Sequence, residues 1–425
     1  MASLWRNREF NLLWTSQSLA DLGDGVASLA LALLVLAETG SPVQAGVVGT
    51  LTQLARLALR LPAGVLVDRT DRRHVMVWCG VLRLTVFATL TVAVLSGRTG
   101  LALILVVAAA DAVGSALSGT AEDASIRSIV PIAQLPTAVA RNEARSYGAS
   151  LAGPPLGGLL FGIAHAVPFL ANAVSSLVSV VLVLFIRKPL QAEREEKPQA
   201  YGAALAEGVR FVVSHPFLRA LMFIAAPLNF AIGGVLFAVI VALQRNGTPP
   251  AVIGLAETIV AVGGLLGAFV APALQRRLSL AALARLICWA AAALLASVAL
   301  LTSSIAAAVP LGIAVFLGPA CNAALFGFQA AITPDRLQGR VSSVIMVAAT
   351  SMAAVAPVLA GALVAAWGPA AAILFFAAAV AGSALLATFG SGIRHAGDRA
   401  PAEAALRSRT SPQSPGSGVR DHDCG

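Results

Sequence analysis

Apolar segments long enough to cross a membrane recur along the whole chain, and they constrain its fold more than any other feature. A helix of about 20 apolar residues crosses the roughly 30 Å of hydrocarbon in a bilayer. With 58% hydrophobic and 12% charged residues, the chain has too little polar surface to cover a soluble globule of this length. The sequence therefore predicts an all-α membrane protein with twelve transmembrane helices. The twelve segments lie near residues 12–36, 43–66, 75–97, 101–121, 143–164, 166–187, 217–243, 250–272, 280–302, 305–330, 341–366 and 369–391.

Lysine and arginine residues are placed unequally around these segments. Of the 29 in the chain, three lie well inside segments and away from their ends, at Arg56, Arg60 and Arg83. Only Arg98 and Arg245 lie on one side of the predicted membrane, and all the others lie on the opposite side. Because cytoplasmic loops carry the excess of basic residues, both termini are predicted to be cytoplasmic, in a multi-pass protein of the cell inner membrane or plasma membrane. The same bias and anionic lipid headgroups account for the net charge of +9.

A long polar stretch, about residues 188–216, divides the apolar segments six and six. Within it, residues 201–213 have the apolar spacing of an amphipathic helix, which is expected to lie on the cytoplasmic membrane surface. The predicted domains are an N-terminal six-helix bundle (1–187), this cytoplasmic linker (188–216) and a C-terminal six-helix bundle (217–391). The remaining residues, 392–425, are rich in Ser, Pro, Gly and Arg and are predicted to form a disordered cytoplasmic tail.

The two halves of the chain resemble repeats of one another. Three pairs of residues in similar local contexts are each separated by the same 203 positions: Gly64 and Gly267, Pro131 and Pro334, Pro154 and Pro357. A duplicated six-helix unit of this kind is typical of transporters that hold substrate at the membrane midplane, between their two halves. The repeat predicts two pseudo-symmetric bundles.

A charged stretch between the second and third segments, residues 64–73, resembles a loop of the major facilitator superfamily with the pattern G-x-L-A-D-R-x-G-R-R/K. Val67 and Asp71 depart from that pattern, and the resulting D-R-x-D-R-R variant is similar to the bacterial siderophore and macrolide exporter branch. Further stretches resemble the same branch, so that the resemblance covers residues 5–392. The matching loop residues are Gly64, Leu66, Asp68, Arg69, Arg72 and Arg73, and the further stretches are 22–24, 39–41, Arg83 and 338–341.

The charged loop is predicted to act as a gate. Gly64 has no Cβ, so that helix backbones can approach closely there, and Asp68 can accept hydrogen bonds from the N-terminus of a neighbouring helix. The resemblance implies that this neighbour is the eleventh segment, which begins near Gly339 and Arg340. It also implies that three arginines complete a charge network holding the outward-facing state, namely Arg69, Arg72 and Arg73. In the alternative interpretation these arginines only anchor the topology.

The fifth segment contains a cluster of glycines and prolines. It is similar to the G-P-x-x-G-G core of a motif associated with antiporters in the superfamily. The prolines remove backbone donors and the glycines admit a close neighbour, so that a helix can bend and pack tightly at this place. An ordinary kinked packing helix is the alternative. The residues concerned are Gly153, Pro154, Pro155, Gly157 and Gly158.

Charged residues inside the apolar segments are expensive unless they are paired or face water. The pattern favours a pair of Asp24 with Arg83, and leaves Asp21 to Arg56 or Arg60, although Arg60 can also reach the membrane edge. Asp111 and Glu257 have no evident partner in the sequence, and burial favours their neutral, protonated forms. We therefore predict that proton coupling involves Asp21, Asp24, Arg83, Asp111 or Glu257; structural ion pairs are the alternative.

Polar amides and aromatic rings in segments otherwise rich in Ala, Leu and Val are candidates for contact with substrate, although amides also join helices. They are Asn172, Asn229, Phe230, Asn322, Phe326 and Gln329. The chain has no Walker A, G-x-S-x-G or H-E-x-x-H pattern, and its four cysteines and five histidines lack metal-ligand spacing, so that no enzyme activity, metal or cofactor is expected.

The sequence therefore predicts a monomeric secondary transporter that exports a small amphipathic compound, such as a drug, siderophore or other natural product. Its expected partners are this small molecule and the lipid bilayer, with no nucleic acid. A proton gradient is the expected driving force, used by proton antiport. An importer or uniporter of a small solute and a non-transporting receptor or scaffold are the alternatives.

Overall fold

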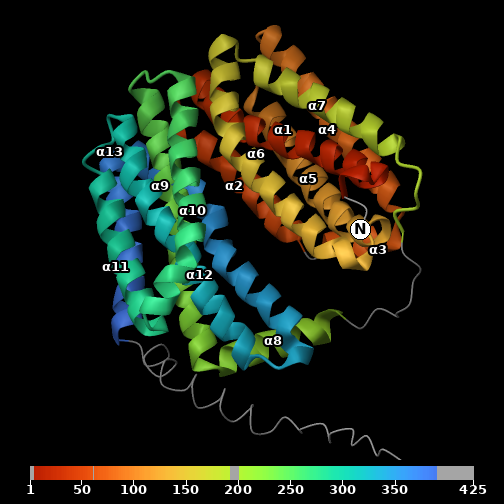
Figure 1. Cartoon of the computed structure of the whole chain (residues 1–425). Helices are drawn as coiled ribbons and strands as arrows, with labels where there is room; N and C mark the ends of the chain where they lie inside the picture. Colours follow the sequence, from red (N-terminus) through yellow and green to blue (C-terminus); the bar gives the residue numbers. More distant parts are fainter. Residues whose placement is uncertain (1–3, 61, 192–200, 390–425) are drawn as a thin grey trace, which may run out of the picture.

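The computed structural model describes residues 4–60, 62–191 and 201–389, and within these ranges the chain forms helices and no strand. Figure 1 shows the helices in two groups, with α8 along the lower end of the second group. The first group comprises α1 (Arg8–Thr39), α2 (Pro42–Leu59), α3 (Pro62–Arg69), α4 (Arg72–Leu95), α5 (Leu101–Ile129), α6 (Leu135–Ile163) and α7 (Val167–Leu184). The second comprises α9 (Pro216–Arg245), α10 (Pro250–Arg277), α11 (Leu280–Val298), α12 (Ala308–Ile332) and α13 (Gln338–Phe389).

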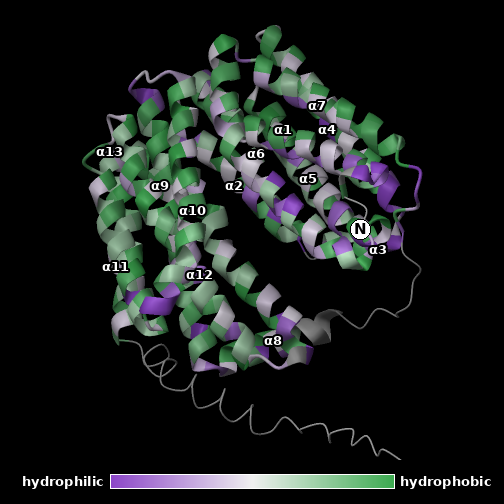
Figure 2. Cartoon of the chain, viewed as in Figure 1, coloured by the Kyte–Doolittle hydropathy of each residue, from purple (hydrophilic) through white to green (hydrophobic). Residues whose placement is uncertain are grey.

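Helices occupy all twelve of the predicted apolar segments. In the described ranges, nine helices are long and apolar enough to cross a membrane. One of them, α13, consists of two helical parts joined at Gly368, whose φ of 84° is a backbone conformation that favours glycine. Figure 2 shows that the middles of the helices are mainly hydrophobic, whereas hydrophilic residues gather around α3 and near α8. The chain is thus an all-α membrane protein, and the number of twelve crossings stays a prediction.

The second predicted segment, residues 43–66, is divided in the structure. α2 ends at Leu59 and a separate short helix, α3, begins at Pro62. A proline lacks the backbone N–H that a continuous helix requires and fits the first turn of a new one. The charged loop predicted after this segment therefore contains a helix of its own, and Gly64 and Asp68 lie within it.

The two helix groups contact each other mainly through two pairs of helices, α2 with α13 and α6 with α10. In the first pair, Gly46 packs on the backbone of Pro357 and Gly361 packs on Pro42. In the second pair, Gly254 packs on the backbone of Pro154 and Gly158 packs on Pro250. Pro154 and Pro357 are one of the pairs that the 203-residue repeat relates, and Gly158 and Gly361 have the same spacing. The interface between the halves is therefore built from symmetry-related contacts.

The buried hydrophobic core is shared by the two helix groups at one end of the molecule and divided between them at the other end. The largest cluster contains residues of both groups, for example Leu33 in α1, Val239 in α9 and Val364 in α13. Near α3, by contrast, a cluster around Phe10 contains residues of the first group, and another around Leu221 contains residues of α8 and the second group. The halves thus share one core at the end where α2 and α10 begin, and have separate cores at the other end.

The amphipathic linker helix forms as predicted, as α8 (Tyr201–Ser214). It packs on the second helix group and not on a membrane surface alone, because Val212 is fully buried in the cluster around Leu221. Glu207 also accepts hydrogen bonds from Arg336 and Arg340, at 2.7 and 2.6 Å. The linker residues 192–200 and the predicted tail, 392–425, lie outside the described residues.

Candidate functional site

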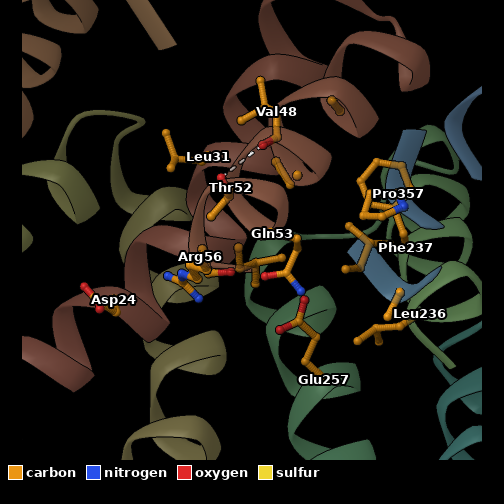
Figure 3. Close-up of a pocket in the computed structure, with 18 of the residues that line it drawn as sticks. Asp24, Leu31, Val48, Thr52, Gln53, Arg56, Leu236, Phe237, Glu257 and Pro357 are labelled. Atoms are coloured by element: carbon orange, nitrogen blue, oxygen red, sulfur yellow. Dashed lines mark hydrogen bonds between the residues drawn. The ribbon is translucent and has the colours of Figure 1, made fainter. Parts of the chain in front are cut away.

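A cavity of about 490 Å³ lies between the two helix groups. Figure 3 shows its labelled residues arranged around a common space, with α2 on one side and α9, α10 and α13 on the other. Most of its wall is apolar, with Leu31 and Val48 from the first group and Leu236 and Phe237 from the second. This size and lining are those of a site for a small, largely apolar molecule. Its polar lining residues include Asp24, Ser28, Thr52, Gln53, Arg56, Asp111, Asn229 and Glu257.

The predicted pair of Asp24 and Arg83 is present at the edge of this cavity. Arg83 of α4 is buried, contacts Asp24 of α1 and donates from Nε to Asp111 of α5 at 2.9 Å. Ser115 also donates to Asp24, at 2.8 Å. Asp111, for which the sequence indicates no partner, therefore shares one arginine with Asp24. The three charges connect three helices, and their mutual attraction offsets part of the cost of burying them.

Asp21 has a different partner from those predicted. It accepts a hydrogen bond from Arg145 of α6 at 2.9 Å, and no ion pair joins it to Arg56 or Arg60 in the described part of the chain. Arg145 also binds both carboxylate oxygens of Glu122 of α5. Asp21 and Asp24 are three residues apart on α1, so that they share a face, but α1 packs against α6 as well as α5. The two acids therefore reach different arginines.

Neither Arg145 nor Glu122 is among the residues predicted for the site. A signal for Arg145 is its position inside the fifth predicted segment, residues 143–164, where a charge needs a partner. Glu122 lies one residue beyond the fourth predicted segment, 101–121, and for that reason it does not stand out in the sequence. Asn142 donates to the same Glu122 carboxylate at 2.9 Å, and completes this second charged cluster.

Two further charged side chains, Arg56 and Glu257, line the cavity. Among the described residues, neither has an oppositely charged group within 4.0 Å, and Arg56 Nε is buried without a hydrogen-bond acceptor. In Figure 3, Arg56 lies between Asp24 on one side and Gln53 and Glu257 on the other. Both residues also line a second, smaller cavity of about 390 Å³, with Asp21 and Ser146. These charges are available to a ligand.

The predicted substrate contacts divide into three groups. Asn229 is exposed and lines the cavity, so that its contact with substrate stays a prediction. Asn172, Phe230 and Gln329 are instead buried in helix packing. Asn172 donates to Gly23 O at 2.9 Å and Gln329 donates to Ser342 at 2.9 Å, so that the amides satisfy polar groups between helices.

Phe230 stacks edge to face on Phe376. Neither Asn322, which is exposed, nor Phe326, which packs in the second group, belongs to the two cavities. Among the described residues, no group of His, Cys, Asp and Glu side chains is arranged to hold a metal ion.

The sequence model of the Major Facilitator Superfamily matches residues 13–357, which is most of the chain. This chain belongs to the major facilitator superfamily. A relative in Bacillus subtilis, the uncharacterized MFS-type transporter YfiS, is 28% identical over 62% of this chain and 64% of its own length. Multidrug efflux pump Tap of Mycobacterium tuberculosis is 29% identical over 59% and 62%, and macrolide efflux protein A of Streptococcus pyogenes is 23% identical over 61% and 65%. The chain spans less than two thirds of the length of these curated relatives.

Solved structures of the superfamily have the same fold. A bacterial homolog of the human lysosomal transporter Spinster, in an inward-facing and unoccupied conformation, has a TM-score of 0.68 and 17% identity over 96% of this chain and 98% of its own. The nucleoside transporter NupG has a TM-score of 0.71 and 11% identity over 89% and 99%. A bacterial homologue of the iron transporter ferroportin, in the inward-facing state, has a TM-score of 0.66 and 17% identity over 90% and 100%. At these identities the likeness establishes the fold alone.

Two residues of the loop that resembles the superfamily pattern, Asp71 and Arg72, make hydrogen bonds within the first helix group. Arg72 donates to Ala124 O and Leu190 O, both at 2.9 Å, and so ties α4 to the end of α5 and to the segment after α7. Asp71, which departs from the superfamily pattern, caps α4, because its side chain accepts from the backbone N–H groups of Arg73 and His74 at 2.8 and 3.2 Å. The departure therefore replaces a flexible position by a helix N-cap.

The close helix approach predicted at Gly64 is absent in this conformation, since an added Cβ would meet no atom within 4 Å, and the same holds at Gly339. Asp68 and Arg69 are exposed. The start of α13 lies beside α8, where Arg340 pairs with Glu207, and Figure 1 shows it away from α3. The gating role of Asp68, Arg69, Arg73, Gly339 and Arg340 stays a prediction.

The glycines of the antiporter-like motif admit close neighbours, as predicted. A Cβ on Gly153 would lie 2.6 Å from the Gly25 Cα, and one on Gly157 would lie 2.5 Å from Val26 O. Both contacts join α6 to α1. Pro154 and Pro155 lie inside α6, which continues through them. The motif therefore packs α6 against α1 and α10, and its bearing on transport stays a prediction.

Proposed function

We propose that the protein exports a small amphipathic compound by alternating access, with protons moving inward as the compound moves out. The observation that carries this proposal is the cavity between the halves, whose wall is mainly apolar and includes Asp24, Arg56, Asp111 and Glu257. The names of two relatives, multidrug efflux pump Tap and macrolide efflux protein A, support the direction of transport. The protein would act as a monomer, without enzyme activity and without a cofactor.

The orientation that the basic residues predict places the α3 and α8 end in the cytoplasm. The contacts of α2 with α13 and of α6 with α10 then close the outer end of the cavity, and the conformation is inward-facing. A substrate would enter this state from the cytoplasm or the inner leaflet. Movement of the halves about these contacts would then open the outer end and close the inner one, where α3 and α13 would meet.

Proton coupling would use carboxylates in or beside the cavity. Asp24 and Asp111 compete for Arg83, so that a proton on one of them leaves the other fully paired. Among the described residues, Glu257 has no such ion pair, and a neutral Glu257 costs less in apolar surroundings than an ionised one. Release of these protons inward would return the carboxylates to their ionised form before the next transport cycle.

Everted membrane vesicles test both the direction and the coupling. Vesicles from a host without its own multidrug pumps should take up ethidium when their lumen is acid, and dissipation of the pH gradient should abolish the uptake. At least one of Asp24→Asn, Asp111→Asn and Glu257→Gln should reduce the uptake to the level of vesicles without the protein. Glu38→Gln, at an exposed position, is the matched control and should keep full activity.

The same measurements separate the proposal from its alternatives. Cells that express the protein should accumulate less ethidium than cells without it. Greater accumulation would indicate an importer, and equal accumulation of all compounds in a broad screen would indicate a receptor or scaffold. If all three carboxylate variants keep uptake that depends on the pH gradient, proton coupling lies elsewhere in the chain.

A further inference from the structure

Some of the charged side chains that line the main cavity have an oppositely charged partner, and others have none among the described residues. Asp24 and Asp111 both contact Arg83, which is itself buried beside the cavity. Arg56 and Glu257 line the same cavity without any ion pair among the described residues. One positive and one negative group are therefore left for whatever occupies the space.

These two groups come from opposite halves of the protein. Arg56 lies in the last turn of α2, in the first helix group, and Glu257 lies in α10, in the second. Both line the smaller cavity as well, so that they lie where the two cavities adjoin. Figure 3 shows Gln53, one turn before Arg56, with its side chain directed toward Glu257. The polar groups thus form a band across the cavity, with α2 on one side of it and α10 on the other.

An unmatched charge in such surroundings is costly. Within the described part of the chain, Arg56 Nε is buried without an acceptor, and a buried donor that has lost water and gained no partner is unfavourable, more so when it is charged. The carboxylate of Glu257 has the same need for a donor or a cation. A ligand that supplies both an anionic and a cationic group would offset both costs at once, whereas a ligand with one charge would leave the other group unmatched.

The rest of the wall requires an apolar body. Leu236, Phe237 and Ile240 of α9 face Leu31 and Val48 of the first group across the same space. These side chains offer no hydrogen bonds, and they favour the part of a ligand that water solvates poorly. The charged band and the apolar wall together describe a ligand with two opposite charges at one end and a hydrophobic body.

We propose that the cavity binds amphipathic zwitterions, with Arg56 taking the anionic group and Glu257 the cationic group. This inference rests on the proposed function, since it names the class of compound that the same site carries. Asp24 and Asp111 are not required to bind a charged group of the ligand, because both carboxylates already pair with Arg83. Gln53 orients the Glu257 carboxylate or donates to the ligand beside it.

A matched pair of dyes tests the proposal. Rhodamine B carries a carboxylate and a delocalised cation, and its ethyl ester carries the cation on nearly the same body. Binding of each dye to the full chain in lipid nanodiscs is measured by fluorescence anisotropy. The protein should bind rhodamine B at least about tenfold more tightly than the ester, since a charge-assisted hydrogen bond contributes roughly 1.5–3 kcal/mol and 1.4 kcal/mol is a factor of ten.

Substitutions at Arg56 and Glu257 test which charged group of the ligand each residue binds. Arg56→Gln should abolish the preference for rhodamine B and leave the affinity for the ester within about twofold, while Arg56→Lys should keep part of the preference. Glu257→Gln should weaken both dyes by at least about tenfold. Arg60→Gln, one turn further along and exposed at the end of α2, is the control and should change neither affinity. Thermal unfolding of each variant confirms that it is folded.

Equal affinities of the unaltered protein for the two dyes would overturn the proposal, as would a preference that persists in Arg56→Gln. The binding measurement needs no pH gradient and no direction of transport. Failure of the zwitterion site is therefore distinguishable from failure of export.

Discussion

At the scale of single residues, Arg83 holds together the buried charges of the first helix group. It contacts Asp24 of α1 and Asp111 of α5 from α4, and its side chain is only 4% exposed. Two carboxylates around one guanidinium are stable only while the guanidinium is present. Arg145 has the same place between Asp21 and Glu122, so that two arginines fix α1 to its neighbours through Asp21 and Asp24, which lie about one turn apart on α1.

Replacement of Arg83 by methionine should destabilise the protein by about 3–5 kcal/mol, because it leaves two buried carboxylates without a cation. Thermal unfolding in detergent measures this loss as a lower Tm. The added change Asp111→Asn should restore part of the stability, since it removes one of the two orphaned acids. Arg98→Met, at an exposed position in the loop before α5, should stay within about 0.5 kcal/mol of the unaltered protein; an equal loss in both variants would contradict this role of Arg83.

At the scale of helices, contacts between glycines and proline backbones hold the two halves together at one end. Gly254 of α10 lies against Pro154 of α6, and Gly46 of α2 lies against Pro357 of α13. A side chain at either glycine would overlap the opposite backbone, and backbone cannot move aside as a flexible side chain can. The helix pairs α6–α10 and α2–α13 are thus complementary in shape only in this close arrangement.

Gly254→Val should therefore separate α6 from α10 and open this end of the molecule. Spin labels at His165→Cys, just after α6, and Asn246→Cys, just after α9, report on this end by electron–electron distance measurement. Their distance should lengthen in the Gly254→Val variant. Gly162→Val is the matched control, because a Cβ at Gly162 meets no atom within 4 Å, and it should leave the distance unchanged. An unaltered distance in both variants would show that the contact does not hold the halves.

At the scale of the whole molecule, the core is joined at one end and separate at the other, which is one of the two states that the proposed alternating access requires. The start of α13 is held by Glu207 of α8 in this state, and the superfamily loop around α3 lies apart from it. Closure of the α3 end would bring the two together and, with the opening of the other end, would produce the opposite state. The charged loop would then reach the helix terminus that its resemblance predicts.

Cysteines at Leu66 of α3 and Gly339 of α13, both exposed, detect this closure. In a background without the four natural cysteines, their oxidative cross-linking should increase when an acid exterior and substrate favour the outward-facing state. Asp68→Asn should reduce both the cross-linking and the rate of transport, with normal insertion into the membrane. Unchanged transport in that variant would exclude the gating role of Asp68.

The sequence by itself determined the class, the helices and the repeat of this protein. Hydrophobicity over about 20 residues and the distribution of basic residues are local properties, so that they need no knowledge of packing. The 203-residue offset identifies Pro154 and Pro357 as equivalent, and the structure confirms that they make equivalent contacts. The pairing of Asp24 with Arg83 was also predictable, since each is a charge inside an apolar segment.

Only the tertiary structure decided which residues share a site. Helical spacing places Asp21 and Asp24 on one face of α1, but the helix that packs against each position depends on contacts between residues distant in the sequence. For the same reason the sequence could not tell that Asn172 and Gln329 join helices while Asn229 lines the cavity, because all three are amides in apolar segments. Arg56 and Glu257 lie 201 positions apart, and they line one cavity only because α2 and α10 border the same space between the halves.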